Sequence, residues 1–174
     1  MNAHATYPAT LDAEGLTLRV PTAQDLPHYA AFYAVSDVEV GGYRGNRTDA
    51  EVQTILNRDI AHWEAKGIGI FLVFEGTTFM GGTGLAHPDD WPCHELTWWL
   101  MPQTRGKGVA TRASRAVITW AYDTLGWDRV ETHMRDENTP ARRLAERLGG
   151  EIDRRQTFPD GVTRDVFLLP RRIA

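Results

Sequence analysis

The sequence has a single cysteine, Cys93, in 174 residues. One cysteine excludes an internal disulfide and any metal cluster built on several thiolates. Charge of one sign is not concentrated anywhere: 19 basic and 23 acidic residues are spread along the chain and leave a formal net charge of −4. Without a basic block the chain is poorly suited to duplex nucleic acid, and stacking single strands on its tryptophans would also need a basic groove. We therefore expect no nucleic-acid partner.

Long apolar runs are also missing. No stretch approaches the roughly 20 apolar residues that span a bilayer. The segment before Leu16 has neither the charged start nor the apolar centre of a secretory signal peptide. The length suits one domain with its own core. We expect a soluble cytoplasmic protein with no membrane association, consisting of an N-terminal arm at residues 1–15 and a single domain at residues 16–170.

The apolar pattern and the turn signals predict one order of elements, β-α-α-β-β-β-α-β-α-β-β. Thr48-Asp49-Ala50-Glu51 is a capping box that begins an apolar helical stripe, and Thr22 followed by Asp25 is a weaker form of the same signal. Three consecutive strands joined by short turns imply antiparallel pairing, and the strand-helix-strand crossover after them implies a parallel pair. The expected strands cover residues 16–20, 68–75, 79–85, 94–101, 128–134, 151–158 and 163–169.

A glycine-punctuated turn at residues 103–110 (QTRGKGVA) lies between an apolar strand and a long helical stretch. This order aims unpaired backbone N–H groups and a helix N-terminus at one point, where a phosphate or pyrophosphate commonly binds. The turn lacks the spacing of the nucleotide hydrolases, and Thr111 stands where a dinucleotide fingerprint has its third glycine. Both of the better-known phosphate loops are therefore excluded.

Three further motifs accompany the turn, which itself matches Q/R-x-x-G-x-G/A. Leu18-Arg19 and Asp25 are similar to an opening L-R-x-x-x-x-x-D, and residues 94–100 (HELTWWL) are similar to E-I-G-Y-W-L. Residues 138–149 (NTPARRLAERLG) are similar to N-x-x-S-x-R-x-L-E-K-L-G. Through these motifs, which cover roughly residues 16–169, the chain resembles the GNAT superfamily of N-acetyltransferases. It is most similar to the branch that acetylates the N-termini of ribosomal proteins (RimJ/RimL-like).

The resemblance implies an α/β (α+β) fold. The expected architecture is a mixed, mostly antiparallel sheet of about seven strands, with helices on both faces and a splayed central strand pair. The resemblance also implies acetyl-CoA as the co-substrate, without a metal. Backbone N–H groups of the turn, assisted by the helix dipole, would bind its pyrophosphate. The turn residues implied are Arg105, Gly106, Lys107, Gly108, Val109 and Ala110.

The remaining cofactor contacts are implied on the strand before the turn and on a later helix. Main-chain groups of Trp99, Leu100 and Met101 would bind the pantetheine arm, whereas their side chains are expected to pack in the core. One N–H near Leu100 would polarise the thioester carbonyl and stabilise the developing oxyanion. Asn138 is expected to cap a helix and, by resemblance, also to bond to the pantetheine arm.

The implied reaction is direct attack of a neutral amine on the thioester. An α-amino group, with a pKa of about 8, needs less help from a base than a lysine side chain near 10.4. Glu95 stands at the matching family position and is the candidate base, acting through a water, although a carboxylate there could equally pair with an arginine. Less favoured candidates for the base are His87, Glu131 and His133. No spacing of the histidines supports a metal site.

The chain departs from the family at the usual proton donors. Relatives carry a tyrosine or a serine near the departing sulfur, and here Ala145 and Ala141 occupy those positions. The thiolate could leave unassisted, take a proton from water, or be reached by Tyr43 or Thr97. The general acid therefore stays unassigned, and a ribosomal-protein substrate is placed in doubt.

By the resemblance, the two early helices and the last hairpin flank the acceptor groove. Tyr33, Tyr43 and Phe158 are candidate wall residues of the acceptor groove, and the loop at residues 89–91 could reach it. The leading prediction is an N-acetyltransferase acting on a peptide N-terminus or a small-molecule amine. An antibiotic- or polyamine-modifying acetyltransferase is the second possibility. A non-catalytic acyl-CoA-binding or partner-binding module is the third. A homodimer is plausible from the family.

Overall fold

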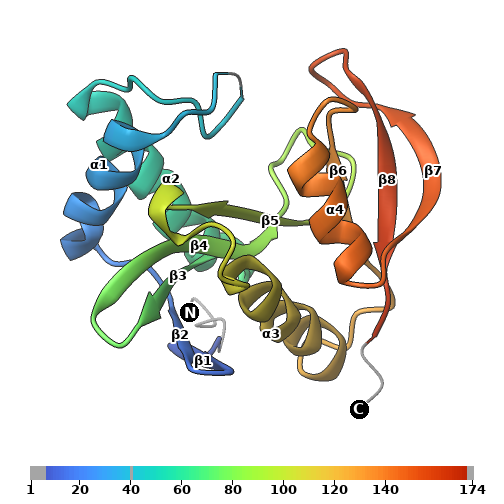
Figure 1. The fold of residues 1–174 in the computed structure, drawn as a ribbon, viewed down its shortest axis with the longest axis horizontal. Coiled ribbons are helices and arrows are strands. Elements are labelled where there is room, and N and C mark those ends of the chain that lie inside the picture. Colours follow the sequence, from blue (N-terminus) through green and yellow to red (C-terminus); the bar gives the residue numbers. More distant parts are fainter. Residues whose placement is uncertain (1–6, 40, 172–174) are drawn as a thin grey trace.

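The computed structural model describes residues 7–39 and 41–171. The strands in this part of the chain form two antiparallel sheets (Figure 1). The five-stranded sheet has the order β1-β2-β3-β4-β5 and contains Thr10–Ala13 (β1), Leu16–Arg19 (β2), Ile70–Glu75 (β3), Thr78–Ala86 (β4) and Glu95–Leu100 (β5). The three-stranded sheet has the order β6-β8-β7 and contains Val130–Met134 (β6), Glu151–Thr157 (β7) and Thr163–Leu169 (β8).

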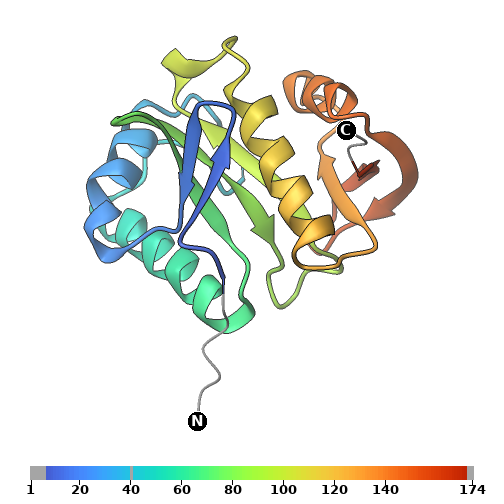
Figure 2. The same ribbon diagram turned by 90° about the horizontal axis from the view of Figure 1, so that it is seen from below.

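Helices cover both faces of the five-stranded sheet, as predicted. Helices α1 and α2 lie on one face, α3 lies on the other, and α4 packs beside α3 over the three-stranded sheet (Figures 1 and 2). The helices cover Leu26–Val35 (α1), Asp49–Lys66 (α2), Val109–Asp123 (α3) and Thr139–Arg147 (α4), with short 3-10 turns at Ala23–Asp25 and Pro102–Thr104. None of the helices in the described residues combines the length and the apolar character needed to cross a membrane.

Strand β3 separates two apolar cores. Phe71 and Val73 pack with α3, and Ile70 and Leu72 pack with α1 and α2. Because successive side chains of a strand point to opposite faces, a continuous apolar run is what a sheet covered on both faces requires. The dense apolar stretch noted in the sequence is therefore explained by burial of this strand on both sides.

The predicted helix starts are confirmed by their local hydrogen bonds. Thr48 and Glu51 close the capping box of α2: the Glu51 N–H donates to the Thr48 hydroxyl, and the Thr48 N–H donates to the Glu51 carboxylate. Asp25 likewise accepts from the Thr22 N–H at 2.7 Å. Asp25 also accepts two hydrogen bonds from Arg19, at 2.7 and 2.9 Å, so that the opening motif of the sequence is a bidentate ion pair.

The N-terminal segment differs from its prediction. Thr10–Ala13, expected to belong to a loose arm, form β1 and pair with β2 in register, with Leu11 opposite Leu18. The strand count is therefore eight in the described residues, and the difference from about seven comes from this segment. Tyr7 packs its ring on that of Trp63, with centroids 4.9 Å apart, which attaches part of the arm to the core. Residues 1–6 of the predicted arm lie outside the described residues.

The splayed strand pair is β5 and β6, which belong to different sheets. The sequence predicted a parallel pair here, whereas β6 forms its ladder with β8. The two strands are joined at one end by the Thr132 hydroxyl, which donates to the Leu96 carbonyl at 2.8 Å. Beyond this bond the facing edges of β5 and β6 carry backbone groups outside either ladder, and such groups need other hydrogen-bond partners.

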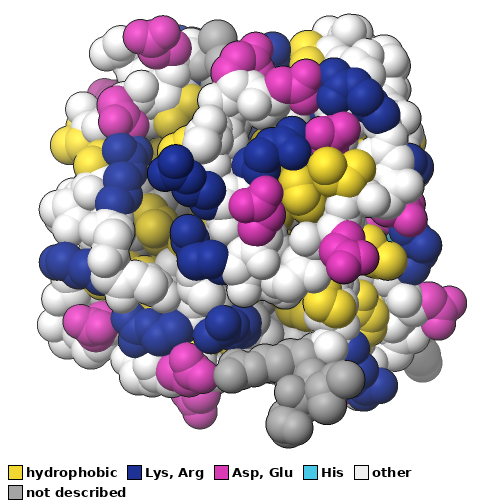
Figure 3. All heavy atoms as spheres, turned by 45° about the vertical axis from the view of Figure 1, so that its right-hand side comes forward, with side chains coloured by type: hydrophobic (Ala, Val, Ile, Leu, Met, Phe, Trp, Pro, Cys, Tyr) yellow, Lys and Arg dark blue, Asp and Glu magenta, His cyan; other side chains and the backbone are white. Residues whose placement is uncertain are grey.

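Charges of both signs are interspersed on the face that carries the three-stranded sheet and α4 (Figure 3). Many of them are paired across elements, as in Arg154 with Glu131 at 2.9 Å and Arg142 with Asp165 at 2.8 Å. This mixed pattern gives the face no large field of one sign.

Candidate active site

The predicted phosphate-binding turn has the backbone conformation that its glycines suggested. Gly106 and Gly108 have φ angles of 76° and 74°, a region that side-chain-bearing residues rarely adopt. A Cβ added to either glycine would meet no atom within 4 Å. The glycines therefore serve the turn's conformation, and the space above the turn is open to a ligand.

The N-terminus of α3, which follows the turn, lacks the cap that α2 has. Its N-cap residue is Gly108, no side chain accepts a hydrogen bond from the first turn, and no acidic residue lies there. Helix α2, in contrast, begins with a capping box and carries Asp49 and Glu51 in its first turn. The first N–H groups of any helix lack intrahelical acceptors, so those of α3 remain available to an anion.

Arg105 joins the turn to the segment between α1 and α2. Its guanidinium donates two hydrogen bonds to the Asp37 carboxylate, at 2.7 and 2.8 Å. These bonds lower the pKa of Asp37 to about 2. The predicted cofactor residue Arg105 is therefore already paired, while its neighbour Lys107 is exposed.

Residues 99–101 lead from strand β5 into the turn. Trp99 and Met101 are buried, and Leu100 is half-buried. The Trp99 ring lies over Gly82 of β4, where an added Cβ would come within 2.5 Å of it. The side chains of residues 99–101 are thus packing residues, as expected. The main-chain groups of Met101 are also engaged, because its N–H donates to the Met80 carbonyl and its carbonyl accepts from Thr104.

Glu95, the predicted base, begins β5 and contacts a residue from the other sheet. Its Oε2 lies 2.6 Å from Nε2 of His133 on β6. The His133 ring packs against Phe158, with centroids 4.1 Å apart, and Trp91 points its indole N–H at the same Nε2 from 3.2 Å. The sequence suggested an arginine as the alternative partner of Glu95. The partner in the structure is His133, which was itself a less favoured candidate for the base.

Thr97 lies two residues after Glu95 and therefore on the same face of β5. Its hydroxyl is 2.8 Å from that of Tyr43, which comes from the segment between α1 and α2. Burial raises the pKa of the Tyr43 hydroxyl well above its ordinary value. The two residues suggested as substitutes for the missing proton donor thus form one hydrogen-bonded pair beside Glu95.

Asn138 begins α4 as predicted. Its side-chain oxygen accepts from the Ala141 N–H at 3.2 Å, which leaves the amide nitrogen as the group that a cofactor would meet. Ala141 and Ala145 are both buried, at 8% and 0% exposure. The usual donor positions are therefore filled by methyl groups packed in the core.

The predicted acceptor-wall residues have structural roles. Tyr33 is 4% exposed and donates to the Gly42 carbonyl, which holds the segment that carries Tyr43. Phe158 is 2% exposed and packs on His133. Of the three, Tyr43 is the one whose polar group faces the β5 residues Glu95 and Thr97. The assignment of all three to the acceptor groove stays a prediction.

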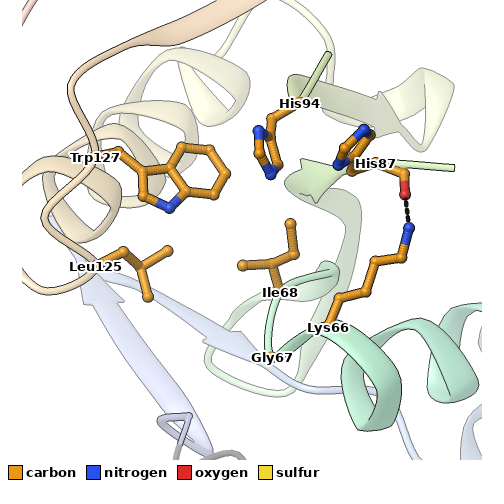
Figure 4. Close-up of a pocket in the computed structure, with 7 residues that line it drawn as sticks. All are labelled: Lys66, Gly67, Ile68, His87, His94, Leu125 and Trp127. Carbon is orange, nitrogen blue, oxygen red and sulfur yellow. Dashed lines mark hydrogen bonds between the residues drawn. The ribbon is translucent and has the colours of Figure 1, made fainter. Parts of the chain in front are cut away.

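A separate depression with a volume of about 500 Å³ lies at the C-terminal ends of α2 and α3 (Figure 4). Lys66 on its rim donates to the His87 carbonyl and lies 2.8 Å from Asp89. His87 and His94 face this depression with their rings 4.3 Å apart. Nε2 of His87 also lies 3.1 Å from the carbonyl of Trp91, the residue whose indole N–H points at His133. The depression is lined by Lys66, Gly67, Ile68, His87, His94, Leu125 and Trp127.

Two contacts of the site were missed in the sequence. Arg105–Asp37 and Glu95–His133 join residues 68 and 38 positions apart, and neither pair has a local signal. The periodicity of β6 places His133 and Glu131 on the same face of the strand, but it does not indicate which residues they contact. Glu131 is engaged elsewhere, with Arg154 and Arg129. Among the described residues, no group of three or more His, Cys, Asp or Glu side chains converges as a metal site would.

Comparisons with known proteins agree on one family. A family model described as an acetyltransferase (GNAT) domain matches residues 15–151. An acetyltransferase from Agrobacterium tumefaciens str. C58 has a similar structure, with a TM-score of 0.80 at 29% identity over 94% of each chain. RimL, a ribosomal L7/L12 alpha-N-protein acetyltransferase solved with coenzyme A, has a TM-score of 0.76 at 12% identity, over 91% of this chain and 96% of that one.

A curated relative matches over a shorter stretch. YdaF of Bacillus subtilis (strain 168), provisionally named a ribosomal N-acetyltransferase, is 34% identical over 55 residues. That match covers 32% of this chain and 30% of YdaF, so the chain matches less than a third of that protein's length.

Strands β5 and β6 separate toward the N-terminus of α3, which begins after Gly108 and has no side-chain cap. This arrangement defines an acyltransferase fold like that of the Agrobacterium acetyltransferase. Because the family model spans more than half of the chain, the protein belongs to the GNAT acetyltransferase family. The predicted fold class and the predicted family are confirmed.

Proposed function

We propose that this protein transfers the acetyl group of acetyl-CoA to a primary amine. The observation that carries the proposal is the open turn at Gly106 and Gly108, joined to an α3 N-terminus without a cap. A pyrophosphate fits both features because it accepts several N–H hydrogen bonds and is stabilised by the helix dipole. The relative RimL, solved with coenzyme A, supports the same class of ligand.

The cofactor would extend from the turn along the gap between β5 and β6. Backbone N–H groups from Gly106 to Ala110 would hold the pyrophosphate, while that of Arg105 donates to the Pro102 carbonyl. Main-chain groups of β5 near Leu100 would hold the pantetheine arm, since the β6-facing edge of β5 lies outside the sheet ladder, whereas those of Met101 are bonded to Met80 and Thr104. The amide nitrogen of Asn138 would meet the arm from the other side, because its oxygen is occupied by the helix cap.

The chemistry proposed for the site is a single displacement. The amine nitrogen forms a bond to the thioester carbon, the carbon–sulfur bond breaks, and coenzyme A leaves as a thiolate. Glu95, directly or through a water, takes the proton that the amine loses. An N–H near Leu100 would stabilise the oxyanion that develops on the carbonyl oxygen.

The acceptor we propose is a peptide or protein N-terminus. The names of YdaF and RimL refer to ribosomal N-acetyltransferases, which supports this class. An α-amino group also matches a site with one candidate base, because it is partly neutral near pH 8. A small-molecule amine, such as a polyamine or an aminoglycoside, is the alternative acceptor on the same fold. A cytoplasmic location and a homodimer accompany this proposal as predictions.

One observation favours a different class of function. Ala141 and Ala145 leave the usual donor positions without a proton donor, as in a non-catalytic acyl-CoA-binding or partner-binding module. The hydrogen-bonded pair of Tyr43 and Thr97 favours catalysis instead, because it supplies hydroxyl groups beside Glu95.

Two measurements test the proposal. Acetyl-CoA is expected to raise the melting temperature of the protein while ATP and NAD do not, and no selective shift would overturn the cofactor assignment. Release of free thiol is then followed with peptides, aminoglycosides and polyamines as acceptors. Turnover with peptides supports N-terminal acetylation, turnover with the small amines supports the alternative acceptor, and binding without turnover supports the non-catalytic module.

A further inference from the structure

We infer that His133 is a positioning residue for Glu95, an inference that rests on the proposed function. Its Nε2 lies 2.6 Å from Oε2 of Glu95, and the side chains are 6% and 18% exposed. The two residues come from different sheets, on the strands β5 and β6 that separate toward the turn. The contact lies next to the Thr132–Leu96 hydrogen bond, at the end where the two strands are joined, and it links the two sheets there.

The His133 ring is held from two further sides. Phe158 packs on it with centroids 4.1 Å apart, and Trp91 lies at 6.0 Å with its N–H directed at Nε2. Packing of this kind leaves the ring little freedom to rotate. A carboxylate bonded to such a ring is restricted in turn, whereas a free glutamate samples several rotamers.

The hydrogen bonds also indicate which nitrogen carries the proton. Nδ1 of His133 is buried and has no hydrogen-bond partner among the described residues. A neutral ring with its proton on Nε2 donates to Glu95 and avoids a buried N–H without an acceptor. The same Nε2 then cannot accept from Trp91. The bond to the charged carboxylate is the stronger of the two, and the half-buried Trp91 can turn its N–H to water.

The consequence for Glu95 is that its two oxygens have different surroundings. Oε2 accepts from His133, so Oε1 is the oxygen left to meet the amine or an intervening water. Misplacement of a reacting group by about 1 Å can lower a rate by as much as roughly 100-fold. His133 would act by keeping Glu95 in the geometry for proton removal, without itself touching the acceptor.

The kinetic test uses His133→Leu and His133→Gln, each made alone and together with Glu95→Gln. Leucine removes the donor, whereas the glutamine amide can place an N–H near the position of Nε2. We expect His133→Leu to lower kcat about tenfold or more with acceptor KM changed less than about threefold, and His133→Gln to restore most of the rate. In the Glu95→Gln background, His133→Leu is expected to cause no further loss. If His133→Leu lowers kcat by the same factor in the wild-type and the Glu95→Gln backgrounds, the positioning role is overturned. A change in the acceptor KM without a change in kcat would overturn it as well.

A second readout does not depend on catalysis or on the leucine variant folding. Nitrogen-15 NMR of the histidine-labelled protein is expected to show His133 with its proton on Nε2, and its resonance to shift in Glu95→Gln. A proton on Nδ1, or no response to Glu95→Gln, would overturn the inference while wild-type turnover still supports the proposed function. Absence of turnover in the wild type would instead overturn the proposed function and, with it, the role of His133.

Discussion

The hydroxyl of Tyr43 lies 2.8 Å from the hydroxyl of Thr97, although the two residues are 54 positions apart. Tyr43 comes from the segment between α1 and α2, and Thr97 lies on β5 on the same face as Glu95. Burial raises the pKa of Tyr43, so this phenol keeps its proton through the neutral range. The pair can therefore donate a hydrogen bond, but its phenol is too weak an acid to transfer a proton readily to a thiolate.

We predict that this pair stabilises the departing thiolate by hydrogen bonding. Tyr43→Phe should lower kcat about 10- to 100-fold, because a hydrogen bond to a charged group contributes about 1.5–3 kcal/mol. Thr97→Val should have a similar effect. Tyr122→Phe is a control at another half-buried tyrosine, whose hydroxyl bonds to the Leu169 carbonyl and does not hold the segment that carries Tyr43. Equal losses in Tyr122→Phe and Tyr43→Phe would contradict the prediction.

Glu95→Gln should lower kcat strongly while the Kd for acetyl-CoA stays unchanged. The amide keeps the shape of the side chain and cannot accept a proton from the amine, and general bases contribute about 10²- to 10⁴-fold. Stopped-flow or steady-state thiol release measures the first quantity and calorimetry the second. Glu131→Gln is a control, because Glu131 pairs with Arg129 and Arg154. A Glu95→Gln protein with wild-type kcat would remove Glu95 as the base.

Gly108→Ala should weaken acetyl-CoA binding and also destabilise the protein. A φ of 74° costs an alanine about 1–2 kcal/mol, and the new methyl group would stand where the pyrophosphate approaches. Gly161→Ala is the matched control, with a φ of 80° in the β7–β8 turn and similarly open surroundings. The melting temperature should fall by a similar amount in both variants, and only Gly108→Ala should raise the Kd for acetyl-CoA. An equal rise in the Kd for acetyl-CoA in Gly161→Ala would show that the effect comes from loss of overall stability.

Asp37→Asn should strengthen acetyl-CoA binding modestly at low salt. Asp37 holds both guanidinium N–H groups of Arg105 that face it, and removing its charge frees Arg105 for the cofactor phosphates. The expected decrease in Kd is about two- to fivefold, as for exposed ion pairs, and it should shrink at high ionic strength. Calorimetry at two salt concentrations measures it, with Asp123→Asn as a distant control. A higher Kd would mean that the pair organises the turn instead.

Asp25 should stabilise the fold above pH 4 and lose that contribution in acid. Burial alone would raise its pKa, but the hydrogen bonds from Arg19 and the Thr22 N–H outweigh it and hold the pKa below its ordinary value. A lowered folded-state pKa gives stability that is present above the unfolded pKa of about 3.9 and is lost as pH falls through the folded one.

Asp25→Asn therefore tests the opening motif as a structural element. It should reduce the free energy of unfolding by about 2 kcal/mol at pH 7, since Asp25 is 3% exposed and accepts charged hydrogen bonds. The difference from wild type should narrow as pH falls below about 4. Urea denaturation across pH measures both effects. Asp123→Asn, in an exposed pair with Arg171, should change stability by less than about 0.5 kcal/mol.

The features of the fold that were predictable from the sequence are those that depend on local contacts. Helix starts at Thr48 and Asn138 and the glycine conformations at Gly106 and Gly108 were predictable, because each depends on neighbours within about four residues. Strand β1 was missed because Thr10–Ala13 is short and gains its hydrogen bonds only by lying beside β2.

By itself, the sequence determined the order of helices and strands apart from β1, the conformation of the glycine turn and the family. These depend on local periodicity, on capping and on the special backbone freedom of glycine. Only the tertiary structure decided that Glu95 meets His133, that Tyr43 meets Thr97 and that Arg105 is held by Asp37. Those contacts join residues far apart in the chain, and they form only when two sheets and the segment between α1 and α2 are packed together.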